Sequence, residues 1–330
     1  MDKFRFGILG PAKIAHRFAH AVGMMPDAEL VAVASSNLGR AKEFAERNHI
    51  PAYYGSYEEM LSRDDIDGVY IATTNNFHYD NLLQCIEHGK HVLCEKSMVM
   101  NQRDAETVFA KAKEKGVFVM EAMWRRFLPH MQRAREWVRS GAIGRVEMAQ
   151  CTIGFRGTLE PENRIYNTAL GGGGLYDIGV YAIEVTGFLV GEAIRDVKTM
   201  LSFVDTGADN VMNISVRYER CIANLQCITT SQIPQQLYLY GTEGYIWLDS
   251  PVGGDTARLY GRDGELIEEC KVTLENGFLY EAQETVRCAR AGKLESEVVP
   301  HRDTIECAAI FDQCMRENER YIAEAAPLNP

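Results

Sequence analysis

The sequence lacks the features of a disulfide-stabilised, secreted or membrane-spanning protein. Its nine cysteines are an odd number and form no C-x-x-C pair, so we expect buried thiols in a reducing compartment. No apolar run approaches the length that spans a bilayer, and no signal-like region follows Met1. The sequence therefore predicts a cytoplasmic protein with no membrane partner.

An excess of positive charge is also missing. The formal net charge is −11, from 35 Lys and Arg against 46 Asp and Glu. Nucleic-acid binding needs a basic face on which phosphates release counterions, so a nucleic-acid partner is disfavoured. We identify no metal site. With 330 residues, 46% apolar and 25% charged, the chain has the composition of a globular protein of about two domains.

Residues 1–122 alternate short apolar strands with helices. Phe4 to Leu9 is an apolar run, and Ile14, Phe18 and Val22 then recur at the spacing of a helix. Repeated βα units imply a parallel, doubly wound sheet with helices on both faces, hence an α/β fold. The predicted strands are 4–9, 30–34, 69–72, 91–94 and 117–121, and the later helices are 40–47, 79–88 and 102–115.

Residues 123–330 have a different pattern. Their strands are rich in β-branched and aromatic residues, and tight connections such as Glu219-Arg220 indicate hairpins. This predicts an α+β domain with a large, mostly antiparallel open sheet. Since such a sheet exposes one apolar face, we expect a homodimer or higher homo-oligomer. The predicted strands are 145–155, 196–204, 211–218, 221–229, 236–240 and 245–248, and the helices are 129–140, 177–189, 279–291 and 304–316.

The segment from Gly10 to Ala15 follows the first strand and opens the first helix. It matches the dinucleotide-binding pattern G-x-G-x-x-A, except that Ala12 replaces the second glycine. A methyl group is the smallest replacement, and the helix beginning near Lys13 directs its positive end toward a diphosphate. The alternative is an ordinary strand–turn–helix. We assign Gly10, Ala12, Lys13 and Ile14 to the cofactor.

The second strand ends in Ser35-Ser36-Asn37, with Arg40 one turn further on. NAD-binding domains place an acid at this strand end to hold the adenosine ribose diol. Here hydroxyls and a guanidinium are available instead, and these groups suit a 2′-phosphate. We therefore expect NADP, with NAD as the alternative. Arg40 has a second interpretation, as a solvated helix residue.

Polar residues also follow the third and fourth strands of the pattern. Ligands of such sheets bind outside the carboxyl ends of the strands. Thr73, Thr74 and Asn75 are expected to cap the next helix or to bind the nicotinamide ribose. His78 suits a structural role better than a catalytic one, although we include it with the cofactor residues. Glu95 and Lys96 lie where cofactor and substrate would meet, and a solvent-facing ion pair is the alternative.

Three stretches together give the chain a resemblance to a known family. They are Glu95-Lys96-Ser97, the segment from Thr73 to His78 (T-T-N-N-F-H), and the segment from Gly171 to Tyr181 (G-G-G-G-L-Y-D-I-G-V-Y). They resemble the glucose–fructose oxidoreductase/inositol dehydrogenase/MocA family over nearly the whole chain. The resemblance implies a Rossmann domain over residues 1–122 and a substrate-binding and oligomerisation domain over residues 123–330.

The family motifs fall on specific residues of this chain. The family's E-K-P becomes Glu95-Lys96-Ser97, which keeps the lysine and leaves the turn geometry open. The family's G-G-x-x-x-D-x-G-x-H begins at Gly172, places its acid at Asp177 and ends at Tyr181, where inositol dehydrogenases carry histidine. The tyrosine resembles the branch with the dimeric dihydrodiol dehydrogenases, as do Arg40 and the segment from Glu121 to Phe127. The resemblance adds Trp124 and Arg125 as cofactor residues, and Trp124, Arg126, Phe155, Arg164 and Tyr166 as candidates for the substrate pocket.

The resemblance also implies catalytic roles. Asp177 and Tyr181 are four apart on a predicted helix and so share a face. Tyr181 is the expected general base, and because a free tyrosine has a pKa of about 10, the Lys96 ammonium is expected to lower that pKa. Lys96 would also polarise the substrate oxygen, and Asp177 would orient the substrate or the lysine. Because Lys96 and Tyr181 belong to different domains, we expect the site in the cleft between them.

The implied function is an NADP-dependent dehydrogenase that acts on a secondary alcohol of a sugar, polyol or vicinal diol. Two alternatives remain open. One is a glycosidase that uses bound NAD for transient oxidation, and the other is a non-catalytic cofactor-binding sensor. A sensor has no need of groups that handle protons, and Lys96, Asp177 and Tyr181 are all present.

Overall fold

The computed structural model describes residues 2–322 and divides the chain into two compact units. The first unit contains the chain up to Trp124 together with Glu275–Ile305, and the second contains Arg125–Leu274 and the chain from Glu306 onward. The sequence predicted a second domain over residues 123–330, which includes 275–305. These residues lie with the first unit because helix α8 (Phe278–Arg290) packs against the first helix and the fifth strand.

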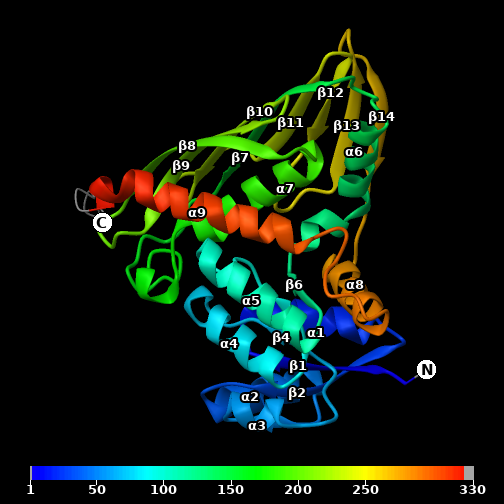
Figure 1. Cartoon of the computed structure of the whole chain (residues 1–330), viewed down its shortest axis with the longest axis vertical. Helices are drawn as coiled ribbons and strands as arrows, with labels where there is room; N and C mark the ends of the chain where they lie inside the picture. The colour runs from blue at the N-terminus through cyan, green and yellow to red at the C-terminus, as the bar shows by residue number, and fades with distance from the viewer. Residues whose placement is uncertain (1, 323–330) are drawn as a thin grey trace. The chain divides into compact units, whose positions relative to one another are not determined.

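The first unit is built on a parallel sheet of six strands in the order β3-β2-β1-β4-β5-β6 (Figure 1). The order reverses between β1 and β4, which is the doubly wound topology of a Rossmann fold. The predicted α/β fold is therefore confirmed. The strands are β1 Phe4–Leu9, β2 Ala28–Ala34, β3 Tyr53–Tyr54, β4 Gly68–Ile71, β5 His91–Cys94 and β6 Val119–Glu121.

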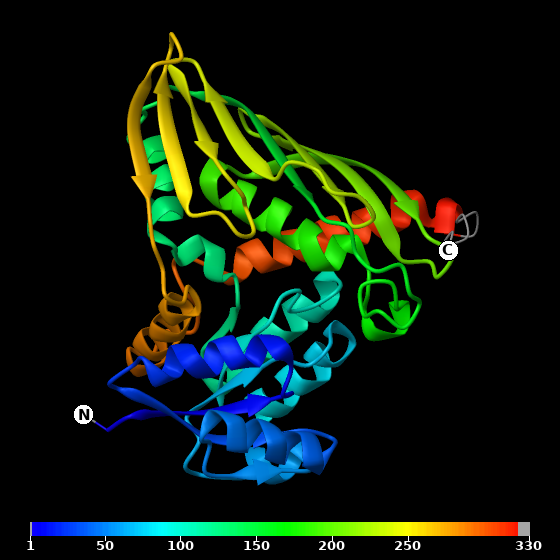
Figure 2. The same cartoon turned by 180° about the vertical axis from the view of Figure 1, so that it is seen from behind.

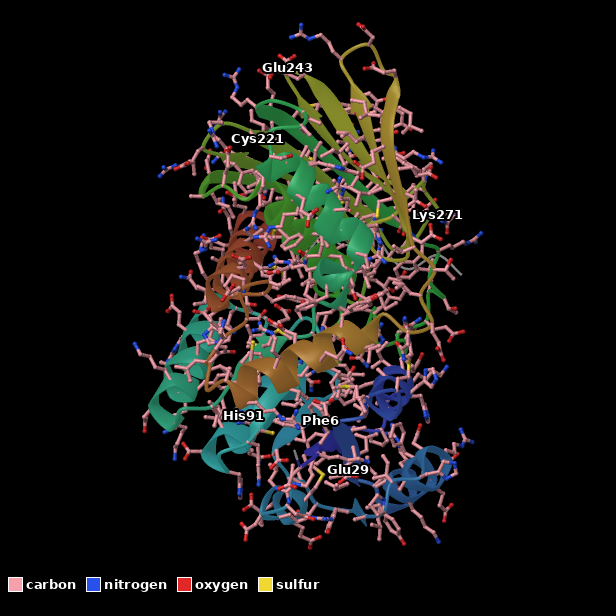
Figure 3. The ribbon with its side chains drawn as sticks, turned by 90° about the vertical axis from the view of Figure 1, so that its right-hand side faces the viewer. Phe6, Glu29, His91, Cys221, Glu243 and Lys271 are labelled. Atoms are coloured by element: carbon pink, nitrogen blue, oxygen red, sulfur yellow. The ribbon has the colours of Figure 1, made fainter. Side chains whose placement is uncertain are left out.

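The core of the first unit forms because helices cover both faces of this sheet. Phe6 of β1 lies fully buried (Figure 3), with its ring edge-on to Phe18 at a centroid distance of 5.3 Å. Phe18 in turn stacks on Tyr70 of β4 at 4.0 Å. The helices are α1 Lys13–Gly23, α2 Leu38–Asn48, α3 Tyr57–Leu61, α4 Asn75–Glu87 and α5 Gln102–Lys115. Helix α4 begins four residues before the predicted start, because Thr74 occupies its N-cap position.

The second unit is built on a sheet of eight strands in the order β14-β13-β12-β11-β7-β10-β9-β8. Only the pair β7–β10 is parallel among the described strand pairs, so the predicted mostly antiparallel sheet is confirmed. Its strands are β7 Val146–Gly154, β8 Ile194–Phe203, β9 Asp209–Tyr218, β10 Ile222–Ile228, β11 Gln236–Gly241, β12 Gly244–Leu248, β13 Thr256–Gly261 and β14 Leu266–Lys271. The last two strands were not predicted.

Helices α6 (Pro129–Arg139), α7 (Val180–Val190) and α9 (His301–Ile322) lie on one face of this sheet (Figures 1 and 2). The stretch Thr168–Val190, which includes α7, is apolar and long enough to cross a membrane by length and composition, yet its most apolar window is 89% buried inside the protein. Its environment is therefore that of a core helix. All nine cysteines are free, and all but Cys270 are buried.

Candidate active site

The turn after β1 lies against the end of β4. Gly10 has a φ of +87°, and a Cβ atom there would lie 2.9 Å from both the carbonyl oxygen of Ala72 and the amide nitrogen of Thr73. Only glycine fits this turn. Since β1 and β4 are the strands between which the sheet order reverses, Gly10 lies at the switch point where doubly wound sheets bind ligands.

The start of α1 fits the diphosphate of a dinucleotide. Ala12 is the N-cap residue, with extended backbone and no side-chain acceptor for the first-turn amides, and the first turn contains no acid. No side chain therefore competes with an anion for these N–H groups, and the helix dipole favours negative charge there. Lys13, the first residue of α1, has an exposed side chain. The residues present thus fit the cofactor that the sequence predicts.

The end of β2 has no carboxylate within residues 35–40. Asn37 caps α2 by accepting a hydrogen bond from the Arg40 amide at 3.1 Å, and the hydroxyl of buried Ser35 accepts one from the Asn37 amide at 3.2 Å. These two side chains shape the turn. Ser36 and Arg40 stay exposed. Arg40 acts electrostatically on Tyr57, where burial raises the phenol pKa and the Arg40 charge opposes the rise.

His78 joins the loops after β4 and β5. The ring is fully buried, with Nδ1 2.8 Å from the carbonyl oxygen of Ser97 and Nε2 3.1 Å from that of Thr73. Burial lowers the pKa of His78. Asn81 donates to the Thr73 hydroxyl at 2.9 Å and holds the same loop. Because backbone oxygens engage both ring nitrogens, His78 supports the loops, and its inclusion among the cofactor residues stays a prediction.

Glu95 and Lys96 do not form a solvent-facing pair. Glu95 is buried and accepts a hydrogen bond from the Tyr70 hydroxyl, while Lys96 is half-buried at the carboxyl end of β5. Burial raises the pKa of Glu95, and the Tyr70 hydrogen bond acts in the opposite direction. The peptide bond between Lys96 and Ser97 is cis. Lys96 therefore lies at the same sheet edge as the Gly10 turn.

A second buried acid near Glu95 was not predicted. Glu281 of α8 is fully buried, and within residues 2–322 neither of its carboxyl oxygens has a hydrogen-bond partner. Burial, and then the charge of Glu95, raise the pKa of Glu281 well above its ordinary value. Sequence reasoning missed this residue because α8 joins the first unit from the far end of the chain.

Trp124 belongs to the first unit. Its ring stacks on Phe278 of α8 at a centroid distance of 5.5 Å, and the guanidinium of Arg17 lies 5.1 Å from the centroid of Trp124. Arg17 is also 4.5 Å from the centroid of Phe278. Arg17, Phe278 and Trp124 thus connect α1, α8 and the end of the N-terminal segment of the first unit.

In the second unit, Asp177 lies in a π-helical turn, Leu175–Gly179, that leads directly into α7. The sequence predicted one regular helix over 177–189. Single π turns inside helices are frequent at functional sites. Asp177 is buried and accepts a hydrogen bond from exposed Arg164 at 2.9 Å, so two of the predicted site residues meet. Tyr181 is buried in the first turn of α7.

Arg125 and Arg126 are buried in the second unit and anchor its interior. The guanidinium of Arg125 donates to the carbonyl oxygens of Ser250 and Gly254 at 2.9 and 2.8 Å. That of Arg126 pairs with buried Glu184 of α7 at 2.5 Å. These contacts engage both side chains inside the unit, and the expectations that Arg125 binds the cofactor and Arg126 the substrate stay predictions.

Tyr166 is also a core residue. It is fully buried, and its hydroxyl donates to the carbonyl oxygen of Thr229 at 2.8 Å. Phe155 is partly buried and packs against the cluster that contains Tyr166 and Ile165. The hydroxyl and ring of Tyr166 are thus both engaged within the unit, and the expectation that Tyr166 lines the substrate pocket stays a prediction.

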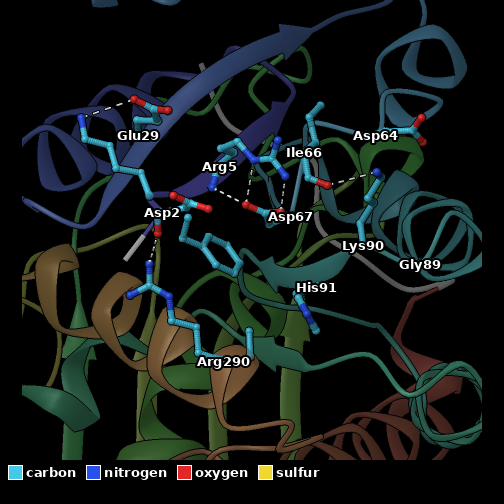
Figure 4. Close-up of a pocket in the computed structure, with 13 residues that line it drawn as sticks. Asp2, Arg5, Glu29, Asp64, Ile66, Asp67, Gly89, Lys90, His91 and Arg290 are labelled. Carbon is cyan, nitrogen blue, oxygen red and sulfur yellow. Dashed lines mark hydrogen bonds and ion pairs between the residues drawn. The ribbon is translucent and has the colours of Figure 1, made fainter.

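A hollow at the opposite, amino-terminal edge of the first unit's sheet is lined by charged side chains (Figure 4). Arg5 donates to both carboxyl oxygens of Asp67 at 2.7 and 3.1 Å. Lys90 donates to the carbonyl oxygens of Arg63 and Ile66 at 2.6 and 3.0 Å. These cations hold the strand ends together, so we assign no ligand to this hollow.

Comparison with known proteins identifies the family of the chain. Residues 4–123 match the oxidoreductase family with an NAD-binding Rossmann fold, and residues 131–247 match the GFO/IDH/MocA C-terminal domain. Trans-1,2-dihydrobenzene-1,2-diol dehydrogenase of Mus musculus is 32% identical over 321 residues, 94% of this chain and 96% of the mouse protein. The Homo sapiens protein of that name is 30% identical over 319 residues, 94% of this chain and 95% of its own length.

Two solved structures share the fold. Aldose-aldose oxidoreductase from Caulobacter crescentus superposes with a TM-score of 0.86 at 24% identity, covering 98% of both chains. KijD10, a 3-ketoreductase from Actinomadura kijaniata in complex with NADP and TDP-benzene, gives 0.84 at 23% identity, covering 99% of this chain and 98% of its own. The two domain matches and the relatives at 30–32% identity over nearly the full chain show that this chain is an oxidoreductase of the GFO/IDH/MocA family.

Proposed function

We propose that the protein is an NADP-dependent dehydrogenase that transfers hydride between the nicotinamide and a secondary alcohol of a sugar, polyol or vicinal diol. The observation that carries the proposal is the place of Lys96, half-buried at the carboxyl end of β5, on the sheet edge whose Gly10 turn fits a dinucleotide. A half-buried ammonium there is suited to binding a substrate oxygen.

The substrate class rests on the relatives. The curated relatives are named for a cyclic vicinal diol, and one structural neighbour is named for aldoses. Both substrates present a secondary hydroxyl beside another oxygen. Sugars, polyols and vicinal diols are therefore the compounds to test first.

The chemistry divides between the cofactor and the protein. When bound, the nicotinamide supplies hydride transfer. In the proposed roles, Lys96 donates a hydrogen bond to the substrate oxygen, Tyr181 takes the hydroxyl proton in oxidation and returns it in reduction, and Asp177 orients the substrate. Arg164, which donates to Asp177, would hold this carboxylate in place.

One experiment separates this function from its alternatives. The protein is mixed with NADP or NAD and a panel of aldoses, inositols and cyclic diols, and the absorbance of reduced nicotinamide is followed. Reduction of NADP by a diol or sugar supports the proposal. Release of a sugar from a glycoside without net reduction would indicate a glycosidase, and tight NADP binding without any turnover would indicate a sensor.

Arg40 is proposed to bind the 2′-phosphate of NADP. Arg40→Ala removes a charge-assisted hydrogen bond and is expected to raise the Kd for NADP by about 10–100-fold, while the Kd for NAD changes by less than about threefold. Isothermal titration calorimetry measures both constants. Arg47→Ala, at the other end of α2 and paired with Glu43, is the control and should leave both unchanged. Equal weakening of NADP and NAD would contradict the assignment.

We also propose that a second copy of the chain covers the free face of the eight-stranded sheet. Four tyrosines of β11, β12 and β13 form ring contacts there, with Tyr245 stacked on Tyr260 at 4.5 Å and Tyr238 on Tyr240 at 5.4 Å. A contiguous aromatic face of this kind is typical of an interface core. Tyr245→Lys places a charge in it and should convert a dimer to a monomer in light scattering. A wild-type monomer at micromolar concentration would contradict the proposal.

A further inference from the structure

A buried carboxylate holds the start of the turn that carries Asp177. Asp209 is the first residue of β9 and is 3% exposed. Its Oδ2 accepts a hydrogen bond at 2.7 Å from the amide of Leu175, the first residue of the π turn. This length is typical of a charge-assisted hydrogen bond. The Ala, Gly and Leu side chains near this helix start cannot accept a hydrogen bond. Asp209, a strand residue 34 positions further along the chain, supplies the acceptor instead.

The glycines before the turn leave the space that the Asp209 carboxylate occupies. Gly173 has a φ of +139°, and a Cβ atom there would lie 2.4 Å from Oδ1 of Asp209. A Cβ atom on Gly174 would lie 3.1 Å from Oδ2. On the other side, a Cβ atom on Gly172 would lie 2.4 Å from the carbonyl oxygen of Arg164. The glycine run therefore lets the carboxylate reach the Leu175 amide, and side chains at these positions would push it away.

No cation lies against Asp209 in residues 2–322. The titratable groups that face it are the phenol of Tyr176 in the π turn and the thiols of Cys227 on β10 and Cys314 on α9. Burial raises the pKa of Asp209 to about 7, and hydrogen bonds from the amides of Leu175 and of Asp209 itself oppose the rise. Asp209 thus changes charge near neutrality.

We propose that Asp209 is a positioning residue whose carboxylate fixes the start of the π turn, and with it the places of Asp177 and Tyr181. This rests on the proposed dehydrogenase function, in which those two side chains act on the substrate. An ionised carboxylate is a stronger acceptor than a protonated one, so the turn is held more firmly above neutral pH than below it. Activity in both reaction directions then depends on the same ionisation.

Two substitutions test the role. Asp209→Ala removes the acceptor and is expected to lower kcat by about 100-fold, while Asp209→Asn keeps a neutral acceptor of similar size and is expected to lower it by about tenfold. The Kd for NADP should stay within about threefold of the wild-type value, because the cofactor residues belong to the other unit. Asn210→Ala is the control, since that side chain bonds to Ser202 and Thr230.

The pH profile separates positioning from proton transfer. A group that takes the substrate proton favours oxidation when ionised and reduction when protonated, so its effect inverts with direction. The Asp209 effect keeps the same sign, so wild-type kcat should fall below about pH 7 in both directions. Asp209→Asn should lose the fall in kcat that both reaction directions share. It should keep the change in kcat that has opposite signs in the two directions. If kcat of Asp209→Asn still fell below about pH 7 in both directions, as in wild type, the inference would be overturned.

Thermal unfolding of the cofactor-free protein gives a second readout. The pKa of Asp209 is about 7 in the folded state and near 3.8 in the unfolded chain, so the folded state binds more protons and loses stability as pH rises from 4 to 7. The Tm of wild type should therefore fall relative to that of Asp209→Asn over this range. Parallel Tm curves would show that Asp209 does not change charge over this range and would overturn the inferred pH dependence of the turn. Absence of wild-type turnover with every alcohol would overturn the proposed function instead, and the Tm comparison would then still show whether buried Asp209 takes up a proton in the folded protein.

Discussion

Lys96→Ala and Tyr181→Phe are each expected to lower kcat by about 10²–10⁴-fold, the usual contribution of a positioned proton-transfer group. The alanine removes the donor to the substrate oxygen, and the phenylalanine removes the group that exchanges the proton. Because neither change affects the Gly10 turn or the start of α1, the Kd for NADP should remain within about threefold of wild type. Steady-state kinetics and calorimetry measure the two quantities.

Matched controls are available for both substitutions. Lys111→Ala on α5 removes a lysine that pairs with Glu87, and Tyr321→Phe removes an exposed hydroxyl of α9. Both should retain wild-type kcat. If Lys96→Ala and Tyr181→Phe kept more than about a tenth of wild-type turnover, the catalytic assignment would be wrong.

Arg126→Met is expected to lower the free energy of unfolding by about 3–5 kcal/mol, because it leaves the buried Glu184 carboxylate without its cation. Both side chains are about 1% exposed, and the guanidinium also donates to the Glu184 carbonyl oxygen at 2.7 Å. Urea unfolding followed by circular dichroism measures the loss.

The double variant Arg126→Met/Glu184→Leu should recover most of that stability, since apolar side chains of similar volume replace a buried ion pair at little cost. Arg133→Met breaks a half-exposed pair with Glu268 and should cost about 1 kcal/mol or less. If Arg126→Met were no more damaging than Arg133→Met, Arg126 would not be an internal anchor, and its original assignment to the substrate would deserve a test.

The sequence was informative where a pattern is local. The alternation of apolar strands and helices over residues 1–122 predicted the parallel sheet, because strands buried on both faces are continuous apolar runs such as Gly68–Ile71. Strands β13 and β14 were missed for the opposite reason. β14 is an edge strand with the sequence L-I-E-E-C-K, and because none of its residues is buried, no face of the strand selects for apolar side chains.

Candidate site residues can be proposed from the sequence when they stand in a motif, and they are missed when a distant segment defines their surroundings. Gly10, Lys96 and Asp177 stand in short motifs. Asp209 stands in no motif, because its partner Leu175 lies 34 residues away. Arg126 and Tyr166 have the chemical character of binding residues, and only their burial against Glu184 and Thr229 shows that they hold the second unit together.

The return of α8 to the first unit has a consequence for biosynthesis. The ribosome completes residues up to Trp124 long before it reaches Asn276, whose amide donates to the Arg17 carbonyl oxygen at 2.7 Å, and Phe278, which stacks on Trp124. At translation speeds of about 5–20 residues per second, the nascent nucleotide-binding unit waits roughly 8–30 seconds for its last helix. During that interval the surface of α1 that α8 later covers is exposed to solvent. A chaperone that binds apolar nascent chains can bind to this surface until α8 covers it.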